Sequence, residues 1–266
     1  MKLNQPLFIG IGGHRCATTW LFQNLVKLNN LVCLSKETHF FSRHFDYGYQ
    51  WYFNQICNNK FDKPICEFST SYFYSHEAPE RIKNKFPNTK IILILRNPIN
   101  RAYSHYRHEI YNNRNIDVDI NISLSENPSF LFLSDYYKYL SRWLEIYKLD
   151  EIKILIFEDI ILDDVSAFNN IQNYLGLSKV NKNSLIKKNI NYSLVPKNTN
   201  SSNLYNLIKG IYINNPLIKS ITPNFIINYL KKSVENKLLT KNVDVDKNNI
   251  ELIKSKFYEN KKNLEN

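Results

Sequence analysis

Three short, unbroken apolar runs constrain the fold more than any other feature of the chain. They are LFIGIG (7–12), KIILIL (90–95) and IKILIF (152–157), and PICEFS (64–69) is a weaker fourth run. A run without polar alternation is typical of a strand that is buried on both faces of a parallel sheet. Segments with helical spacing separate the runs over residues 7–176. This order predicts an α/β domain with a central parallel sheet flanked by helices.

The expected helices have recognisable ends. One runs from Thr18 to about Leu28, and another follows Asn97–Pro98, where Asn is a good N-cap and Pro suits the first helical position. Further helices are expected at 76–86, at 136–147 and at 163–176, the last ended by Gly176. Residues 113–134 and 178–203 are interpreted as polar loops. Helical spacing resumes after Leu204, and residues 245–266 predict a charged helix.

We expect residues 1–266 to form one domain, with an α/β core at 7–177 and a loop and mainly helical extension at 178–266. The net charge is +11, from 35 basic and 24 acidic residues. This excess fits an anionic partner such as nucleic acid, acidic glycan, anionic membrane or a phosphorylated cofactor. It equally fits a solubilising lysine-rich surface, so composition leaves the partner open.

The four cysteines are expected to be reduced thiols. Cys16, Cys33, Cys57 and Cys66 form no C-x-x-C pair, and no Cys/His cluster has zinc spacing. The N-terminal segment lacks the length and cleavage site of a signal peptide, and no run approaches about 20 apolar residues. The expectation is a cytoplasmic protein without a transmembrane segment and without a metal.

The first candidate site is the loop in FIGIGGHRCATTWLFQNL (8–25). A strand, a glycine turn and a helix N-terminus form an anion site, because unpaired N–H groups point at the ligand. Gly12 and Gly13 allow close approach, Arg15 carries charge, and Thr18 and Thr19 offer hydroxyls. The Lys of a triphosphate loop is missing, and so is the apparatus for magnesium. The alternative is an ordinary tight turn with a surface arginine.

Two further segments carry candidate chemistry. In LRNPINRAYSHY (95–106), Arg96 ends a central strand on the same rim as the loop, and Ser104 lies two turns into the next helix. Together they could hold a second phosphate, or they could be ordinary solvated residues. In SKETHFFS (35–42), Glu37 and His39 face the same side if the segment is extended, and a carboxylate beside an imidazole could act as a general base. The alternative there is a surface loop anchored by Phe40 and Phe41.

Taken together, these segments resemble the sulfotransferases that use 3′-phosphoadenosine 5′-phosphosulfate (PAPS). The loop resembles the family's 5′-phosphosulfate loop, and IILILRNPINRAYSHYRHE resembles its 3′-phosphate motif. KETHFF is similar to a segment of the glycan-modifying branch, which includes heparan sulfate sulfotransferases. The resemblance runs from about Leu7 to Leu177. It implies a three-layer fold like that of P-loop NTPases, PAPS as donor and adenosine 3′,5′-bisphosphate (PAP) as product.

The resemblance also implies a role for each matching residue. Glu37 would be the catalytic base, Arg15 would stabilise charge on the leaving phosphate, and His39 would assist or orient the acceptor. Arg96 and Ser104 would hold the 3′-phosphate. The donor-binding loop would comprise Gly12, Gly13, His14, Arg15, Cys16, Ala17, Thr18, Thr19 and Trp20.

The chain departs from the family pattern at three positions. Arg15 stands where the family usually has Lys, and Phe68 follows Glu67 where the glycan branch often has Lys. The donor-capping loop of the family is unclear, and Lys197 is the candidate replacement. For the acceptor, a carbohydrate or glycolipid is expected. Aromatic residues that could stack on a sugar, or could instead be core, are Tyr47, Tyr49, Trp51 and Tyr52.

Two rival functions remain from the residues alone. A nucleotide kinase would require magnesium-dependent ATP binding, which the loop does not favour. A non-catalytic basic protein would bind nucleic acid or acidic glycan in a salt-dependent manner. The sulfotransferase interpretation instead predicts a small-molecule donor and no nucleic-acid partner.

Overall fold

The computed structural model describes residues 6–28, 31–58, 63–111, 117, 119–179, 184–186, 195–196, 239–240 and 247–265. The chain divides into two compact units, which are described separately. The first unit comprises Met1–Arg101 and Asp135–Asn189, and the second comprises Ala102–Ser134 and Ile190–Asn266. The division falls within a helix, α5 (Pro98–Tyr111). This division does not test the prediction of one domain, or the predicted boundary between its core (7–177) and its extension (178–266).

The first unit is built on a four-stranded parallel sheet with the strand order β2-β1-β3-β4. The strands are β1 (Leu7–Gly12), β2 (Ile65–Phe68), β3 (Lys90–Leu95) and β4 (Ile152–Ile156). The two inner strands, β1 and β3, are two of the three strongest apolar runs, because a central parallel strand has no solvent-facing side. The predicted central parallel sheet is confirmed.

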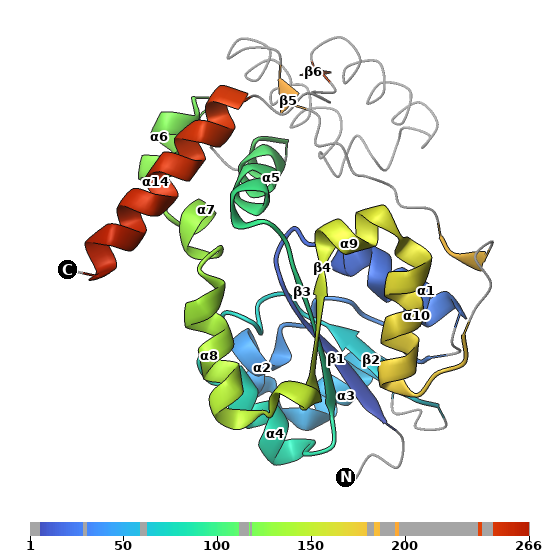
Figure 1. Ribbon diagram of the computed structural model, residues 1–266. Helices are drawn as coiled ribbons and strands as arrows, with labels where there is room; N and C mark the ends of the chain where they lie inside the picture. Colours follow the sequence, from blue (N-terminus) through green and yellow to red (C-terminus); the bar gives the residue numbers. More distant parts are fainter. Residues whose placement is uncertain are drawn as a thin grey trace, which may run out of the picture. The chain divides into compact units, whose positions relative to one another are not determined.

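Alternate residues of the strands serve two hydrophobic cores, one on each face of the sheet. Ile91 and Leu93 of β3 belong to one core, and Ile92 and Ile94 belong to the other. The first core is covered by α2 (Phe40–Arg43), α3 (Gly48–Cys57), α4 (Ala78–Lys85) and α8 (Tyr136–Ile146). The second is covered by α1 (Thr18–Leu28), α9 (Phe157–Leu162) and α10 (Asp164–Leu175) (Figure 1). Helices, sheet and helices form the three layers that were predicted.

The predicted helix ends agree with the structure. The Oδ1 of Asn97 accepts hydrogen bonds of 3.1 Å from the N–H groups of Ile99 and Asn100, which caps α5. Gly176 has a φ of 76° and ends α10 in the left-handed conformation. The described part of the first unit also contains the short 3₁₀ helices η1 (Phe45–Tyr47) and η2 (Leu149–Glu151).

The second unit contains helices where a polar loop was predicted. Residues 113–134 include α6 (Ile120–Glu126), capped by the Asp119 side chain, and α7 (Ser129–Phe132). The loop prediction was wrong there, because a few apolar residues among the polar ones are buried: Ile120, Leu124, Phe130 and Leu131. Both helices contact α14 (Lys247–Glu265), which confirms the predicted C-terminal charged helix. A two-residue antiparallel pair joins β5 (Val195–Pro196) to β6 (Leu239–Thr240).

Several smaller predictions can also be compared with the structure. All four cysteines are free thiols, as expected. Within the described residues, no helix has the length and apolar character needed to cross a membrane. The same residues contain no group of three or more metal-ligating side chains. Lys197 and the helical pattern that begins at Leu204 lie outside the described residues, apart from β6 and α14.

Candidate functional site

The candidate residues of the first unit gather at one edge of the sheet, where parallel strands end. The N–H of Gly13, just after β1, donates to the carbonyl of Ile94 in β3 over 2.6 Å. The N–H of Ser69, just after β2, donates to the carbonyl of Gly10 over 3.0 Å. Ligands of open parallel sheets bind beyond this edge. The topology therefore brings together three segments that are far apart in the sequence.

The loop after β1 is held in an unusual backbone conformation. Arg15 and Ala17 have φ angles of 66° and 62°, and Gly12 has a φ of 151°. A side chain on Gly12 would also place its Cβ 3.0 Å from the Cβ of Phe73. Left-handed non-glycine residues cost roughly 1–2 kcal/mol each, and they cluster where function requires a particular geometry. The surrounding structure thus holds this loop in a strained conformation that an ordinary tight turn would not need.

Two of the loop's N–H groups are used to fix it to the fold. Gly13 donates to Ile94, as described above, and His14 donates to the hydroxyl of Tyr74 over 3.1 Å. The N–H groups at the start of α1 have no carbonyl within the helix to bind, and they carry the positive end of the helix dipole. Thr18 is buried at this helix start and Thr19 is exposed. These donors are the best candidates for an anionic ligand.

Cys16 and Trp20, predicted as part of the donor loop, have side chains in the second hydrophobic core. Burial raises the pKa of the Cys16 thiol to about 12, so this side chain is neutral at physiological pH. The indole N–H of Trp20 donates to the carbonyl of Ile186 over 3.1 Å. Both side chains therefore pack the loop and the following helix against the sheet.

Arg96 reaches the loop, as its position at the end of β3 predicted. Its Nη1 donates to the carbonyl of Arg15 over 3.3 Å, and its guanidinium lies 4.3 Å from the centre of the Phe157 ring. The Nε is buried without a hydrogen-bond partner in the described part of the chain, and burial lowers the pKa of this guanidinium. A partly buried cation with a buried, unused Nε–H donor suits an anionic ligand. Ser104 lies on α5 in the second unit.

Glu37 and His39 are close together, although the predicted reason was wrong. They have φ angles of 63° and 53°, so the segment is not the extended strand that the sequence suggested. Two left-handed turns nevertheless bring Nε2 of His39 to 3.8 Å from Oε2 of Glu37. Arg15, Ala17, Glu37 and His39 are four of the five non-glycine residues with positive φ in the described ranges. Backbone strain is therefore concentrated in the two candidate segments.

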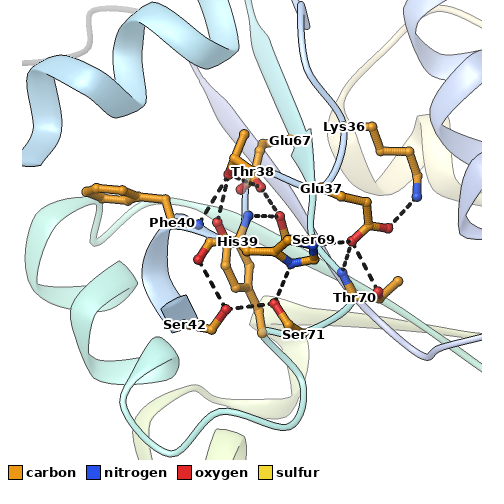
Figure 2. A network of polar contacts seen from close by, with 11 residues as sticks. Lys36, Glu37, Thr38, His39, Phe40, Ser42, Glu67, Ser69, Thr70 and Ser71 are labelled. Atoms are coloured by element: carbon orange, nitrogen blue, oxygen red, sulfur yellow. Dashed lines mark hydrogen bonds and ion pairs between the residues drawn. The ribbon is translucent and has the colours of Figure 1, made fainter. Parts of the chain in front are cut away.

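The end of β2 holds this segment in place. The N–H of Glu37 donates to the carbonyl of Phe68 over 2.7 Å, and the N–H of His39 donates to Oγ of Ser69 over 2.9 Å. The N–H of Thr70 donates in turn to Oε2 of Glu37 over 2.8 Å (Figure 2). Glu37 and His39 thus each have hydrogen-bond partners about 30 residues away in the sequence.

Glu67 is a site residue that the sequence analysis did not identify. Its carboxylate is completely buried in β2 and accepts hydrogen bonds from Thr38 (2.9 Å), Ser69 (2.5 Å) and Tyr52 (3.4 Å). Burial raises the pKa of Glu67 to about 7, although the hydrogen bonds from Ser69 and Thr38 oppose this rise. One signal was available in the sequence, since a charged residue interrupts the apolar run ICEF.

A comparison with protein families shows to which family the chain belongs. The chain matches the model of the sulfotransferase domain over residues 7–220. It belongs to the sulfotransferase family. The resemblance found in the sequence is thereby confirmed.

Relatives of this sulfotransferase domain are found among glycan-modifying enzymes. Human heparan sulfate glucosamine 3-O-sulfotransferase 3B1 is 26% identical over 189 residues, which are 67% of this chain and 47% of that protein. Mouse heparan sulfate glucosamine 3-O-sulfotransferase 6 is 28% identical over 188 residues, which are 67% of this chain and 54% of that protein. The chain thus spans about half the length of these relatives. A solved sulfotransferase from Alicyclobacillus acidocaldarius shares the fold, with a TM-score of 0.58 and 20% identity over 84% of this chain and 99% of that one.

The aromatic residues expected near the sulfotransferase site fall into two groups. Tyr52 is buried and stacks on Phe40, so of the two alternatives left open by the sequence it belongs to the core. Tyr49 is partly buried against the same core. Tyr47 is 60% exposed, stacks on His44 with ring centroids 5.1 Å apart, and meets Trp51 edge to face at 5.1 Å.

Proposed function

We propose that this sulfotransferase domain transfers a sulfuryl group from PAPS to a hydroxyl or amine of a carbohydrate-containing acceptor. One observation carries the proposal. At a single sheet edge, a strained donor loop and the start of α1 lie beside the partly buried guanidinium of Arg96, whose Nε is buried without a partner among the described residues. The Glu37–His39 pair is held at the same edge by hydrogen bonds to the end of β2. The loop, the start of α1 and Arg96 would bind the anionic donor, and the Glu37–His39 pair would accept a proton.

The donor is proposed to bind through its two ends. Thr18, Thr19 and the first N–H groups of α1 hold the 5′-phosphate. Arg15 stabilises the charge that develops on this phosphate as it leaves. The family resemblance assigns the 3′-phosphate to Arg96 and to Ser104. It makes Lys197, which lies outside the described residues, the candidate for covering the bound donor. The donor supplies the sulfuryl group and a leaving group that needs no bridging metal.

The reaction is an in-line displacement at sulfur, in which positioning and charge stabilisation dominate, as in phosphoryl transfer. The acceptor oxygen or nitrogen forms a bond to sulfur while the bond from sulfur to the bridging oxygen breaks. The proton of the acceptor goes to the Glu37–His39 pair. The family resemblance assigns the role of base to Glu37 and gives His39 an assisting role.

A carbohydrate acceptor is supported by the names of the relatives and by the exposed aromatic surface. Relatives named for O-sulfation and for N-sulfation both match the chain, including the human bifunctional heparan sulfate N-deacetylase/N-sulfotransferase 3, which is 28% identical over 196 residues covering 65% of this chain and 22% of that protein. The ring of Tyr47 is available for stacking on a sugar. The backbone N–H of His44, which stacks on Tyr47, donates to the carbonyl of His39 over 3.3 Å, so this surface is close to the proposed base. A cytoplasmic location remains a prediction.

Two measurements test the proposal. Sulfate transfer from labelled PAPS is measured over a panel of sulfated and unsulfated glycans, with glycolipids as a second set. Thermal stability is measured with PAP, with ATP plus magnesium, and with a nucleic acid of equal charge. We expect transfer to at least one glycan and a stabilisation that is specific for PAP. Stabilisation by ATP and magnesium alone would indicate a kinase, and salt-dependent stabilisation by any polyanion would indicate a non-catalytic binding protein.

A further inference from the structure

Two of the four cysteines, Cys33 and Cys66, lie side by side at the β2 edge of the sheet. Val32 pairs with Ile65 of β2 in a parallel bridge. The N–H of Val32 donates to the carbonyl of Pro64 over 2.9 Å, and the N–H of Cys66 donates to the carbonyl of Val32 over 3.0 Å. Cys33 and Cys66 are therefore the next residues on two paired segments.

Both thiols are on the same face of the sheet. Side chains alternate between the two faces along a strand. Val32 packs against the first core, which contains Ile65, whereas Cys33 packs against the second core, which contains Cys66. Paired residues of adjacent strands are about 4.8 Å apart, and a disulfide requires a Cα separation of about 4.4–6.8 Å. A disulfide between the two cysteines therefore fits the backbone.

The two side chains interact as thiols in the reduced chain. The pKa of the Cys66 thiol is raised well above its usual value, first by a hydrogen bond with the Cys33 side chain and then by burial. The Cys33 thiol donates to the carbonyl of Ser35 over 3.5 Å. Cys66 is completely buried, and Cys33 is partly exposed. A reagent from solution therefore reaches Cys33 first, and Cys66 is the neighbour that completes a disulfide.

We propose that Cys33 and Cys66 form a reversible disulfide, and that this bond slows sulfate transfer by displacing the segment that carries Glu37 and His39. The oxidant is a small-molecule disulfide. The effect on transfer rests on the proposed function, whereas the formation of the bond does not.

The bond forms by thiol–disulfide exchange. The Cys33 thiol loses its proton, and the thiolate attacks one sulfur of the small-molecule disulfide. The S–S bond of that molecule breaks, and one thiolate leaves with the electron pair. The Cys66 sulfur then displaces the second thiolate from Cys33. The leaving thiolates take up the two protons, so the protein loses two hydrogens and two electrons and the oxidant becomes two thiols.

The disulfide acts on the site through the short segment that follows Cys33. Two bonded sulfurs are about 2.05 Å apart, which is closer than any non-bonded pair, so one side has to move. Cys66 is held in β2, where it pairs with Phe8 of β1. Cys33 lies just outside the strands and therefore moves. It also loses the hydrogen that it donates to Ser35, two residues before Glu37.

Glu37 and His39 are sensitive to this movement because hydrogen bonds to the end of β2 hold their left-handed backbone. The N–H of Glu37 donates to the carbonyl of Phe68, and the N–H of His39 donates to Oγ of Ser69. Phe68 and Ser69 follow Cys66 and stay in place when the other segment moves. Misplacing a reacting group by about 1 Å costs about 10²-fold in rate. The donor loop follows β1 and should keep its geometry.

Formation of the bond is tested on the full chain by mass spectrometry. The reduced protein is equilibrated with reduced and oxidised glutathione at graded ratios, and the remaining thiols are alkylated. Trypsin cuts after Lys36 and Arg43, which separate the two cysteines in the sequence. We expect a linked pair of peptides that contain Cys33 and Cys66 and that dithiothreitol separates. Glutathione on Cys33 alone, or no linked pair at any ratio, would overturn the inference.

Cys33→Ser and Cys57→Ser are the matched variants. Cys33→Ser changes a partly exposed residue and keeps a donor for the carbonyl of Ser35, so it should fold but form no disulfide. Cys57→Ser keeps a donor for the carbonyl of Phe53, which the Cys57 thiol binds over 3.3 Å. It should form the bond between Cys33 and Cys66 as the wild type does. An intramolecular disulfide that persists in Cys33→Ser would overturn the assignment of the pair.

The effect on the site is first measured without an acceptor. Amide hydrogen exchange reports whether the N–H groups of Glu37 and His39 are still held by the end of β2. We expect both amides to exchange faster in the oxidised wild type than in the reduced wild type. Cys33→Ser should exchange equally under both conditions. Equal exchange in the reduced and the fully oxidised wild type would contradict the proposed displacement.

The effect on activity is measured with labelled PAPS and the panel of glycans. We expect oxidation to lower transfer by the wild type about 10²-fold and dithiothreitol to restore it, with PAP affinity unchanged within about twofold. Transfer by Cys33→Ser should not respond to oxidation. Unchanged transfer by the fully oxidised wild type would overturn the effect on activity. A reduced wild type without any transfer would instead overturn the proposed function, while the linked peptides and the exchange rates would still decide on the disulfide.

Discussion

The hydroxyl of Thr38 donates a 2.9 Å hydrogen bond to the buried carboxylate of Glu67. Thr38 is the residue between Glu37 and His39, so this bond fixes the centre of the segment that carries both candidate proton acceptors. The same carboxylate accepts from Ser69, whose oxygen binds the N–H of His39. Glu67 therefore supports the geometry of the site from inside the sheet, without reaching the substrate side.

Glu67→Gln should change how stability depends on pH. Burial raises the pKa of Glu67 to about 7, above the ordinary value of 4.5. Between these two values the folded chain keeps a proton that the unfolded chain has lost. The contribution of Glu67 to the free energy of unfolding is therefore largest below about pH 4.5. It falls as the pH rises to about 7 and is constant above that. The total is on the order of 3 kcal/mol, from about 2.5 pKa units at 1.36 kcal/mol each.

The measurement is the free energy of unfolding in urea from pH 4.5 to 8. The advantage of Glu67→Gln over the wild type should increase from pH 4.5 to about pH 7 and then stay constant. Glu145→Gln, at an exposed position on α8, is the matched control and should leave the slope unchanged. Parallel curves for the wild type and Glu67→Gln would show that Glu67 is ionised throughout.

Lys36→Met should move the acid limb of the activity profile to higher pH. Nζ of Lys36 lies 2.5 Å from Oε1 of Glu37, and its positive charge lowers the pKa of His39. Removing that charge makes the imidazolium easier to form, so the ring stays protonated up to a higher pH. The check is kcat against pH, with Lys138→Met on the exposed face of α8 as control. A shift to lower pH would contradict the electrostatic role of Lys36.

Arg15→Ala should lower kcat about 10²–10³-fold and change PAP binding much less, because the charge of Arg15 is required mainly when the phosphate leaves. Arg15→Lys should retain more activity than Arg15→Ala, although reach and geometry differ. All three side chains share the cost of the left-handed φ of 66°, so the comparison isolates charge. Single-turnover rates and PAP titration measure the two effects. Equal losses in both variants would point to guanidinium geometry instead.

Ser104→Ala should weaken the discrimination between PAP and 5′-AMP. If the hydroxyl binds the 3′-phosphate, its removal costs about tenfold in PAP affinity and leaves 5′-AMP unaffected, since 5′-AMP lacks that phosphate. Calorimetric titration with both nucleotides gives the ratio of the two Kd values. Ser125→Ala, at an exposed serine on α6 that donates to its own helix, should keep the wild-type ratio. A proportional loss for both nucleotides would mean that Ser104 acts only on the fold.

The sequence was sufficient for the elements that depend on local pattern. KIILIL became the inner strand β3, and Asn97 caps the helix after it. The sequence was insufficient where the conformation of a segment depends on its packing against other segments. Residues 120–132 form helices because a few apolar side chains among polar neighbours are buried. Local composition alone gave a loop for this segment.

The sequence by itself determined the family of this chain, its parallel sheet and the candidate pair Glu37 and His39, because motifs and apolar periodicity are properties of neighbouring residues. Only the tertiary structure decided how that pair is held. Glu67, Ser69 and Ser71 belong to a segment about 30 residues further along, and parallel pairing of β2 with β1 brings it to the site. Hydrogen bonds across that distance in sequence hold two left-handed residues and the ring of His39. No local pattern encodes these contacts, because they form only when the sheet does.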